Sequence, residues 1–483
     1  MANSQTDVFH RLVSDSLGTP PPSAPLPLSI GEAVDCVRET RASGLVLLDE
    51  DGCPAGLLTE TDIARRVTFS ADATAPVTDF MTAPVITAAH DEYLYLAIAR
   101  MRKNGLRHLP VVDGAGRLAG ILHLDDALAG AAEDLVERID LLSEEGGEAA
   151  LHAVKRAQIA IAADLLADNV PVADVQGLIT YVNNDLYRRV MDGVLAEMPG
   201  PPPVPFALIV MGSGGRGENF LSPDQDNGLI LADYPDEDHD RIDAWFLEFA
   251  DRLTIGMDAI GLPLCTGNVM ATNPLWRKTQ SQWHEQIGLW VRRRGMAALL
   301  LADIFFDFVP VAGDTSMAVP VRERITDLMA DAPLFLNGMQ KQHDSMRSAL
   351  GLFGRFRTEP GGSEHAGKID IKHAAVQPAV AAARLLALKD GIPATGTLDR
   401  VRALAEQQVI APDDAEEICA AFGTVCDILL RSQIAAVEAG EPVTNYVAPA
   451  ALRRSQKRDL KAGLRVIENF AARARAEFTG GTL

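Results

Sequence analysis

Residues 211–228 read MGSGGRGENFLSPDQDNG and stand between two apolar runs, FALIV before them and LILAD after them. The two runs have the length and composition of buried β-strands. Gly212 and Gly214 allow backbone N–H groups to approach a phosphate closely, and Ser213 adds a hydroxyl group. Arg216 offers a guanidinium fork that suits phosphate oxygens. The stretch therefore predicts a phosphate-binding turn between two strands.

Two carboxylates follow this turn. Asp224 and Asp226 lie on either side of Gln225, where the second strand is expected to begin. Side chains alternate along a strand, so both carboxylates should face the same side. Paired carboxylates together with triphosphate oxygens form a suitable magnesium site, and the ion would activate a hydroxyl for attack on a phosphate. A purely structural role of the pair in the turn is the alternative.

The string GSGGRGENFLSPDQDNGLIL resembles the polymerase-β-type nucleotidyltransferase superfamily. It is most similar to nucleotidyltransferase domains related to the N-terminal part of PII-protein uridylyltransferases. The resemblance implies that Gly212 and Ser213 grip the terminal phosphates of a nucleoside triphosphate and that Asp224 and Asp226 bind Mg²⁺. Arg216 and Glu218 also match family positions, and Glu218 could simply form a salt bridge within the loop.

The sequence departs from this family at the third carboxylate. Such sites usually carry one on a neighbouring strand, and the segment expected to form that strand, LPLCTGNVM, offers Cys265 instead. Asp258, Asp303 and Asp307 are nearby in sequence and remain open as replacements. A catalytically inactive nucleotide-sensing regulatory protein is therefore the alternative to an active transferase.

An internal repeat precedes this region. GLVLLDEDGCPAGLLTETD and RHLPVVDGAGRLAGILHLDD each contain a strand, an Asp-Gly turn, a second strand and an aspartate that opens a helix. They resemble a tandem pair of cystathionine-β-synthase (CBS) repeats. The resemblance implies an adenine nucleotide as a possible ligand, held by Thr59 and Asp62 in the first copy and by Asp126 in the second, where His123 replaces the threonine. Alternatively, Asp62 and Asp126 only cap helices.

The predicted fold is multidomain α/β plus all-α, and the length of 483 residues agrees with several domains. We expect a flexible lead-in over 1–21, a tandem CBS module over 22–130 and a helical connector over 131–200. A polymerase-β-like nucleotidyltransferase domain with a mixed sheet follows over 201–325. A C-terminal helical bundle over 326–483 resembles the substrate-binding domain of the same family.

Composition limits the partners. The net charge of −22 argues against broad nucleic-acid binding and against binding to anionic membranes. MAALLLADIFFDF is too short for a membrane span and contains Asp303 and Asp307. The N-terminus lacks the pattern of a signal peptide, and the cysteines have no metal-ligand spacing, so a cytoplasmic location is expected.

A few further patterns point to packing rather than chemistry. Trp276, Trp283 and Trp290 recur every seven residues and predict one helix face packed on a core. Lys368 and Lys372 are expected to be exposed, with a phosphate contact as the alternative. Together the patterns predict a nucleotide-regulated, Mg²⁺-dependent nucleotidyltransferase. It would transfer a nucleoside monophosphate to a hydroxyl of a protein or small-molecule acceptor, and the chain is expected to form a homodimer.

Overall fold

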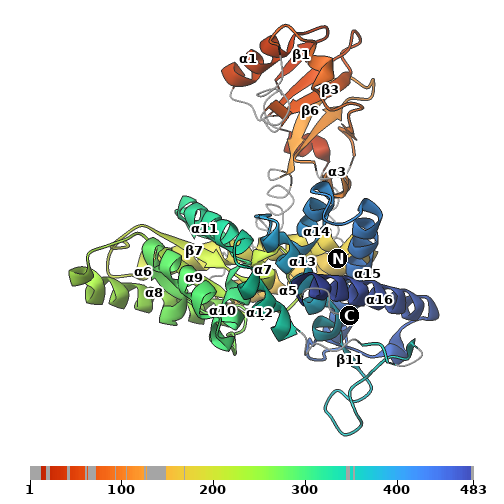
Figure 1. Ribbon diagram of the computed structural model, residues 1–483. Coiled ribbons are helices and arrows are strands. Elements are labelled where there is room, and N and C mark those ends of the chain that lie inside the picture. Colours follow the sequence, from red (N-terminus) through yellow and green to blue (C-terminus); the bar gives the residue numbers. More distant parts are fainter. Residues whose placement is uncertain are drawn as a thin grey trace. The chain divides into compact units, whose positions relative to one another are not determined.

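The structure is a computed structural model of the whole chain, and it describes residues 12–17, 22–40, 44–59, 62–63, 72–92, 94–104, 106–124, 127, 148–167, 169–343, 349–351 and 354–479. The chain divides into two compact units, Met1–Gly146 and Gly147–Leu483 (Figure 1). Each unit is described by itself.

The first unit contains two copies of one small sheet. In the first copy, β1 (Ser23–Pro25) pairs in parallel with β2 (Gly44–Leu48), which pairs antiparallel with β3 (Pro54–Thr59). In the second, β4 (Ala88–Ala89), β5 (His108–Val112) and β6 (Leu118–His123) repeat this order and these directions. Helices α1 (Ile30–Thr40) and α3 (Leu94–Lys103) belong to the first and second copies. The predicted internal repeat is confirmed.

The turns between the paired strands show which residues are equivalent. The Asp49 carboxylate accepts from the N–H groups of residues 51 and 53, and Asp113 accepts in the same way from residues 115 and 117. Gly52 and Gly116 both have positive φ, at 79° and 81°. The shared turn is thus Asp-x-x-Gly rather than an Asp-Gly pair, since a left-handed residue must follow the capping aspartate by three positions.

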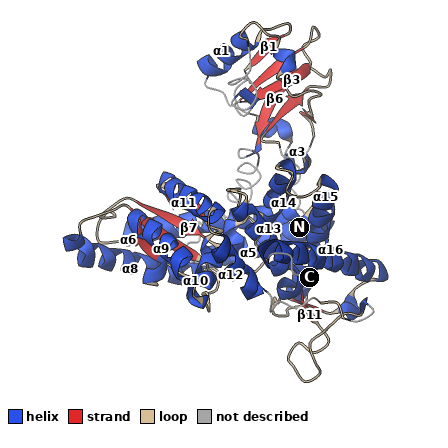
Figure 2. Cartoon of the chain, in the orientation of Figure 1, coloured by secondary structure: helices blue, strands red, loops and turns tan. Residues whose placement is uncertain are grey.

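The second unit is built on a four-stranded mixed sheet, as predicted (Figure 2). The order is β10 (Val309–Gly313), β7 (Phe206–Val210), β8 (Asn227–Leu231) and β9 (Arg277–Thr279). The first two pairings are antiparallel, and β8 pairs with β9 in parallel. All residues of β7 and β8 are buried, which explains why FALIV and NGLIL are apolar without alternation.

The prediction of a third strand over 262–270 is wrong. That segment contributes a single bridge, from Leu264 to Gln225, and the strand beside β8 is β9. The reason lies in a turn: the N–H of Asn268 donates to the carbonyl of Cys265 at 2.9 Å, and Asn268 adopts a left-handed φ of 55°. A residue in that conformation ends an extended strand.

Helices surround this sheet in the second unit. Those that precede the C-terminal region are α5 (Glu148–Ala167), α6 (Val172–Glu197), the short α7 (Gly212–Gly215), α8 (His239–Ala259), α9 (Gln280–Arg293), α10 (Met296–Phe305), α11 (Ala318–Ala330) and α12 (Pro333–His343). Helix α6 packs against α8 and β10. Helices α6 and α8 therefore pack together beside the sheet, within the same compact unit.

The three tryptophans are core residues, as predicted, but they do not share one helix. Trp283 and Trp290 lie on α9, whereas Trp276 lies in the 3₁₀ turn Pro274–Trp276 before β9. The indole N–H of Trp283 donates to the carbonyl of Leu229 at 3.0 Å, and its ring stacks on Phe305 with 4.1 Å between centroids. This contact joins α9 to β8 and to α10.

The C-terminal region is mostly helical. Its elements are β11 (Ile369–Asp370), the π-helical turn η9 (Lys372–Val376), α13 (Gln377–Lys389), α14 (Thr397–Glu406), α15 (Pro412–Glu438), β12 (Tyr446–Val447) and α16 (Arg454–Thr479). Helix α13 contacts α12, α14 and α16 and is buried along most of its length (Figure 1). The predicted fold class, multidomain α/β with a helical C-terminal part, is confirmed.

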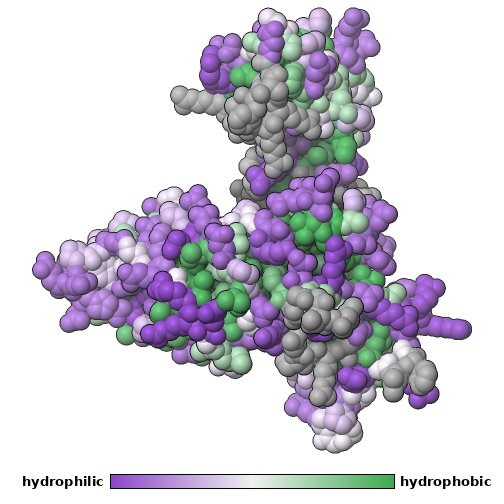
Figure 3. Space-filling view, in the orientation of Figure 1, coloured by the Kyte–Doolittle hydropathy of each residue, from purple (hydrophilic) through white to green (hydrophobic). Residues whose placement is uncertain are grey.

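One helix in the described ranges, α15, is long and apolar enough to cross a membrane by length and composition. It packs against α16 and α6, and 56% of its apolar window is buried within the unit. The exposed surface in Figure 3 is largely hydrophilic with scattered apolar patches, in keeping with the high net charge.

Candidate nucleotide site

The glycine-rich turn and the acidic pair meet at the ends of β7 and β8. The N–H of Met211 donates to the carbonyl of Asp226 at 2.8 Å. A Cβ atom placed on Gly212 would lie 2.7 Å from Asp226 Oδ2, and Gly212 has a φ of 59°. Only glycine satisfies both conditions without strain. The carboxylate of Asp226 therefore lies directly against the start of the turn.

The two carboxylates share a side because the residue between them points away. The Gln225 side chain is buried, and its amide donates to the carbonyls of Thr254 (3.0 Å) and Leu262 (2.8 Å). Asp224 is exposed and Asp226 is half-buried, one residue before β8 begins. The alternation expected of a strand thus extends into the segment that precedes it.

Burial raises the pKa of Asp226 to about 6. The Asp224 charge adds to this rise, whereas a hydrogen bond from Cys265 and the charges of Lys372 and Arg216 oppose it. A carboxylate held in this way is stabilised by a cation beside it. The oxygen donors of Asp224 and Asp226 suit Mg²⁺, which commonly takes one or two carboxylates and completes its shell with phosphate oxygens and water.

Cys265 lies beside Asp226, on the segment where the family resemblance implies a third carboxylate. Burial, followed by the Asp226 charge, raises the pKa of its thiol, so the thiol stays protonated and donates to the carboxylate. Within the described ranges, no group of three or more His, Cys, Asp and Glu side chains is arranged to hold a metal ion. Among the described residues, the pair Asp224 and Asp226 is therefore the candidate donor set.

The turn itself presents backbone donors. The N–H groups of residues 212–214 begin a helical turn and so have no acceptor inside it. Ser213 Oγ donates to Asn219 Oδ1 at 3.0 Å, so this hydroxyl is engaged with its own loop. Gly214 faces Val210, where an added Cβ would come within 2.4 Å of the side chain. Gly214 is thus required by packing whether or not a phosphate binds.

Arg216 has a different role from the predicted phosphate contact. Its side chain is 11% exposed, its Nε donates to Glu218 at 2.7 Å and its Nη1 donates to Asp307 at 2.9 Å. The guanidinium is therefore occupied by two carboxylates. Glu218 also accepts from the N–H of Thr397 at 2.6 Å, so the predicted loop salt bridge extends to α14.

Asp307 collects three arginines in the interior. The carboxylate is fully buried and accepts from Arg216, from Arg384 on α13 (Nε, 3.0 Å) and from Arg400 on α14 (2.6 Å). Burial alone would raise the pKa of Asp307, but the charges of Arg384, Arg400 and Arg216 hold it far below its ordinary value. The Asp307 carboxylate is neutralised by these arginines and is not the missing third metal ligand.

The helical C-terminal region also reaches the acidic pair. Lys372, the first residue of η9, is half-buried, and its charge lowers the pKa of Asp226. The sequence pattern predicts an exposed lysine here. Arg384 on α13 and Arg400 on α14 donate to Asp307, which also accepts from Arg216 of the turn, so both parts of the second unit contribute to this cluster.

In the first unit, Thr59 and Asp62 bond to each other. Thr59 donates to Asp62 Oδ2 through Oγ1 at 2.7 Å and through N–H at 3.1 Å, and Asp62 N–H donates back to Thr59 Oγ1 at 3.2 Å. This reciprocal arrangement caps a helix start. His123 packs edge-on against His108 with 4.9 Å between ring centroids. Asp126 lies outside the described residues.

Three family models match segments of the chain that contain these residues. The description "Putative nucleotidyltransferase DUF294" matches residues 156–296, and "Putative nucleotidyltransferase substrate binding domain" matches 333–478. The CBS domain matches 13–68 and 77–133. The chain therefore carries both DUF294 domains and a CBS pair. The DUF294 match contains the glycine-rich turn and both aspartates, whereas Asp303 and Asp307 lie between the two matched segments.

Curated relatives match only a small part of the chain. Inosine-5'-monophosphate dehydrogenase of Mycobacterium bovis is 39% identical over 92 residues, which is 19% of this chain and 16% of the dehydrogenase. L-aspartate semialdehyde sulfurtransferase of Methanocaldococcus jannaschii is 34% identical over 115 residues, 24% of this chain and 22% of that enzyme. The chain thus spans about a sixth to a fifth of the length of these relatives.

A CBS domain protein from Pyrobaculum aerophilum, solved with AMP, is a similar structure. It is 27% identical, with a TM-score of 0.24, and the match covers 26% of this chain and 99% of that one.

Proposed function

We propose that this DUF294 protein transfers a nucleoside monophosphate from a nucleoside triphosphate to a hydroxyl group, with Mg²⁺ bound by Asp224 and Asp226. The observation that carries the proposal is the contact of Asp226 with the first residue of the glycine-rich turn, 2.7 Å from a Cβ position on Gly212. This contact brings carboxylates and backbone donors to one place. A cation-bridged polyphosphate requires both.

Each residue of the site has a role in this proposal that follows from its chemistry. The N–H groups of residues 212–214 would hold the terminal phosphates, while Arg216 fixes the end of the turn through Glu218 and Asp307. Lys372 adds positive charge on the side of Asp226. Bound Mg²⁺ would neutralise charge on the phosphate that is attacked. Arg216 is thus a positioning residue in this proposal, not a phosphate ligand.

The test is Mg²⁺-dependent nucleotide binding and pyrophosphate release by the full chain. Asp224→Asn and Asp226→Asn should each reduce pyrophosphate release at least 100-fold, because each removes one ligand charge from the ion. Asp240→Asn, an exposed site on α8, makes the same charge change and should leave release unchanged. Full turnover in both site variants would refute the assignment.

The acceptor that we would test first is a protein hydroxyl, as in the uridylyltransferases that the sequence resembles. ATP, CTP, GTP and UTP should be compared, since no described contact selects a base. Incorporation of label from an α-phosphate into protein would identify this acceptor class. Label that is found in a small-molecule product would identify a small-molecule acceptor instead.

A second candidate function has one observation in its favour. Cys265, and not a third carboxylate, lies beside Asp226. Burial raises the pKa of its thiol, so the thiol carries no negative charge for a metal ion. A site with two carboxylates could bind nucleotide without turnover, which would make the protein a sensor. Calorimetric binding of MgATP or MgUTP without pyrophosphate release would favour this reading. If Cys265→Asp then gained turnover, the missing carboxylate would be the cause.

We further propose that the CBS pair binds an adenine nucleotide that regulates this activity. The support is the CBS family match together with the position of Thr59 and Asp62 at the junction of strand β3 and a helix start. Such a junction favours phosphate. AMP, ADP and ATP titrations of the full chain, repeated with Thr59→Ala, test this part separately.

A further inference from the structure

The first half of α16 carries a row of basic side chains. Arg454, Lys457, Lys461 and Arg465 follow one another at intervals of three or four residues, so they lie along one side of the helix. The buried side of α16 packs against α13 and α15. Arg454 and Arg465 are exposed and the two lysines are half-buried, so the row forms part of the surface. It extends about 16 Å along the helix axis.

A turn that precedes β11 extends this row. Its two arms meet at an antiparallel bridge between Leu350 and Phe356. The Lys461 ammonium group lies 5.0 Å from the centre of the Phe356 ring, which is within the range of a cation–π contact. A Cβ atom placed on Gly354 would lie 2.9 Å from the Arg465 guanidinium. The turn therefore packs directly against the basic side of α16.

The turn and the helix together form a surface that we call the basic face. Its residues are Arg355, Arg357, Arg454, Lys457, Lys461 and Arg465. In the described part of the chain, none of these side chains has a carboxylate within ion-pair distance, and the nearby Asp459 pairs with Arg458 at 3.0 Å. The chain as a whole has a net charge of −22. The basic face is therefore a local concentration of uncompensated positive charge on an acidic protein.

The chemistry of the basic face favours carboxylates of a protein over phosphates of a nucleic acid or a membrane. Among the described residues, no large apolar side chain is exposed on this face, so none would insert into a membrane. The Phe356 ring is covered by Lys461 and is not free to stack on a base. The net charge of −22 repels a long polyphosphate chain. A short acidic segment brings its charge only to the basic face, where guanidinium groups form strong bonds with carboxylates.

We propose that the basic face docks an acidic segment of the acceptor protein, whose hydroxyl group is modified at the Gly212–Asp226 site. The acceptor role rests on the proposed function. The docking stands without it, because it depends only on charge complementarity, which supplies specificity and fast association.

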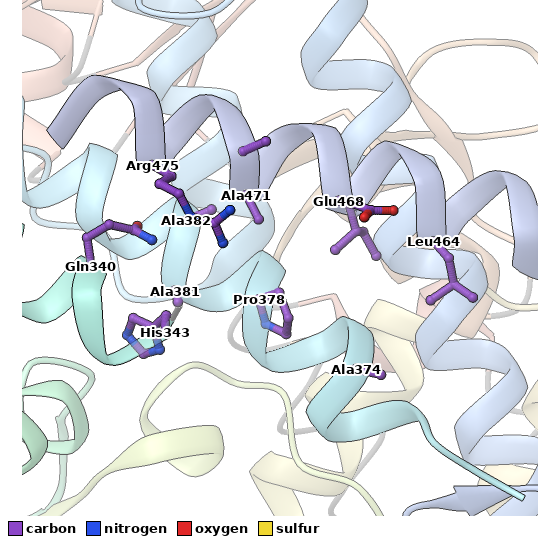
Figure 4. A pocket seen from close by; sticks show the side chains of 12 residues that line it. Gln340, His343, Ala374, Pro378, Ala381, Ala382, Leu464, Glu468, Ala471 and Arg475 are labelled. Carbon is purple, nitrogen blue, oxygen red and sulfur yellow. The ribbon is translucent and has the colours of Figure 1, made fainter. Parts of the chain in front are cut away.

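The position of the basic face agrees with this role. The segment that matches the substrate-binding domain, residues 333–478, contains the whole face. Helix α16 contacts η9, and Leu464 of α16 and Ala374 of η9 line one cavity (Figure 4). Lys372 begins η9, and its charge lowers the pKa of Asp226. Element η9 therefore connects α16 with the acidic pair.

In the transfer step, the acceptor hydroxyl oxygen forms a bond to the α-phosphorus of the nucleoside triphosphate. The bond from that phosphorus to the bridging oxygen breaks, and its electron pair leaves with pyrophosphate. The hydroxyl proton passes to water. The basic face takes no part in these bonds, so its residues act on the binding of the acceptor and not on the reacting atoms.

The docking test uses the full chain and a fluorescein-labelled peptide in which glutamates surround one serine and one tyrosine. We expect saturable binding, measured by fluorescence anisotropy, that weakens as the salt concentration rises. The same peptide with glutamine in place of every glutamate should bind at least tenfold more weakly. Absence of binding by the Glu peptide, or equal binding of the two peptides, overturns the proposal.

Charge reversal tests where the peptide binds. Arg357→Glu combined with Arg465→Glu should weaken binding of the Glu peptide at least tenfold. Arg292→Glu combined with Arg293→Glu is the matched control, since both arginines are exposed at the end of α9 and the change in net charge is the same. This control should bind the peptide like the wild type. Equal weakening in both variants would mean that binding follows net charge alone, and it overturns the site.

A milder variant keeps the test decisive if charge reversal disturbs folding. Arg454→Gln combined with Lys457→Gln removes two charges from the start of α16. It should weaken binding of the Glu peptide at least threefold at an unchanged melting temperature. An unchanged affinity contradicts the extent of the basic face along α16.

The same variants distinguish three other occupants of the basic face. Oligouridylate or phosphatidylserine vesicles that bind more tightly than the Glu peptide, and that lose binding in the charge-reversed variant, would identify a nucleic acid or a membrane as the partner. A lower oligomeric mass of that variant in analytical ultracentrifugation would identify a second copy of the chain. Each of these results overturns the proposal of an acidic acceptor.

The acceptor role is measured as incorporation of label from the α-phosphate of each nucleoside triphosphate into the two peptides. We expect the KM for the Glu peptide to be at least tenfold below that for the Gln peptide. Arg357→Glu combined with Arg465→Glu should raise this KM and leave kcat unchanged. Docking and pyrophosphate release with equal or no incorporation into the peptides overturns the acceptor role. Absence of pyrophosphate release with every nucleotide refutes the proposed function instead, and the docking result is unaffected.

Discussion

The buried carboxylate of Asp307 gives the sharpest test of how the second unit is held together. Asp307→Asn keeps the size of the side chain and removes its charge. Arg216 would keep Glu218 as a partner and Arg384 would keep Asp303. Arg400 would keep no carboxylate, since its other bond is to the carbonyl of Ala394. The variant therefore leaves one guanidinium buried without a counter-charge.

The magnitude follows from that single uncompensated charge. Removal of one partner of a buried ion pair costs about 3–5 kcal/mol. The Arg400 side chain is 1% exposed, so solvent cannot replace the lost partner. At roughly 2 °C per kcal/mol for a large domain, we expect the melting temperature of the second unit to fall by about 6–10 °C.

The assay is thermal unfolding followed by circular dichroism, with Asp414→Asn as the matched control. Asp414 pairs with Arg473 at the surface, where the side chains are 52% and 46% exposed. An exposed pair contributes about 0–1 kcal/mol, so this variant should melt close to the wild type. If Asp307→Asn and Asp414→Asn melted at the same temperature, the reasoning about the cluster would be refuted.

The pH dependence supplies an independent check. The pKa of Asp307 is far below that of an unfolded aspartate, about 3.9, so the unfolded chain binds the proton more readily. The stability that the carboxylate contributes is then complete above about pH 5 and declines as the pH falls through 4. The difference between the wild type and Asp307→Asn should be constant from pH 5 to 8 and should shrink in acid.

Three further substitutions have definite expectations. Gly215→Ala would place a Cβ atom 1.7 Å from the carbonyl oxygen of Asp307. In Gly217→Ala the new Cβ atom would meet open space, and the positive φ of 74° costs about 1–2 kcal/mol. Gly215→Ala should therefore lower the free energy of unfolding at least twice as much as Gly217→Ala. Burial lowers the pKa of Lys155 to about 8. Its charge therefore opposes folding below pH 8, and Lys155→Met should stabilise by about 1–3 kcal/mol at pH 7, with the gain fading as the pH rises from 8 toward 10.5. Thr59→Ala removes a helix cap and should cost the first unit about 1 kcal/mol, seen as faster hydrogen exchange in β2 and β3.

Local patterns in the sequence predicted the parts of the fold and site that depend on neighbouring residues. The CBS repeat was recognisable because the same order of strand, turn and strand recurs after about 60 residues. The common orientation of Asp224 and Asp226 followed from alternation, and the structure has both on the side away from buried Gln225. The contact with Gly212 then required only that β7 and β8 be adjacent.

Asp307, the partner of Arg216 outside its own loop, could not be predicted in this way. Asp307 lies 91 residues further along the chain, and Arg384 lies 77 residues beyond Asp307. No spacing rule connects these positions, because Asp307 reaches Arg216 through the pairing of β10 with β7, and Arg384 reaches Asp307 through the packing of α13. The strand prediction over 262–270 failed for a local reason, the left-handed turn at Asn268, which an apolar pattern does not reveal.

The charges of this cluster explain why the two DUF294 segments form one compact unit. Three arginines, Arg216, Arg384 and Arg400, pair with three carboxylates, Glu218, Asp303 and Asp307. Two of the arginines come from the substrate-binding segment, and every carboxylate comes from the chain before it. Separation of the segments would leave Arg384 and Arg400 without these partners, whereas Arg216 would keep both Glu218 and Asp307. The cluster, together with the hydrogen bond from the Thr397 N–H to Glu218, therefore joins the glycine-rich turn to α13 and α14.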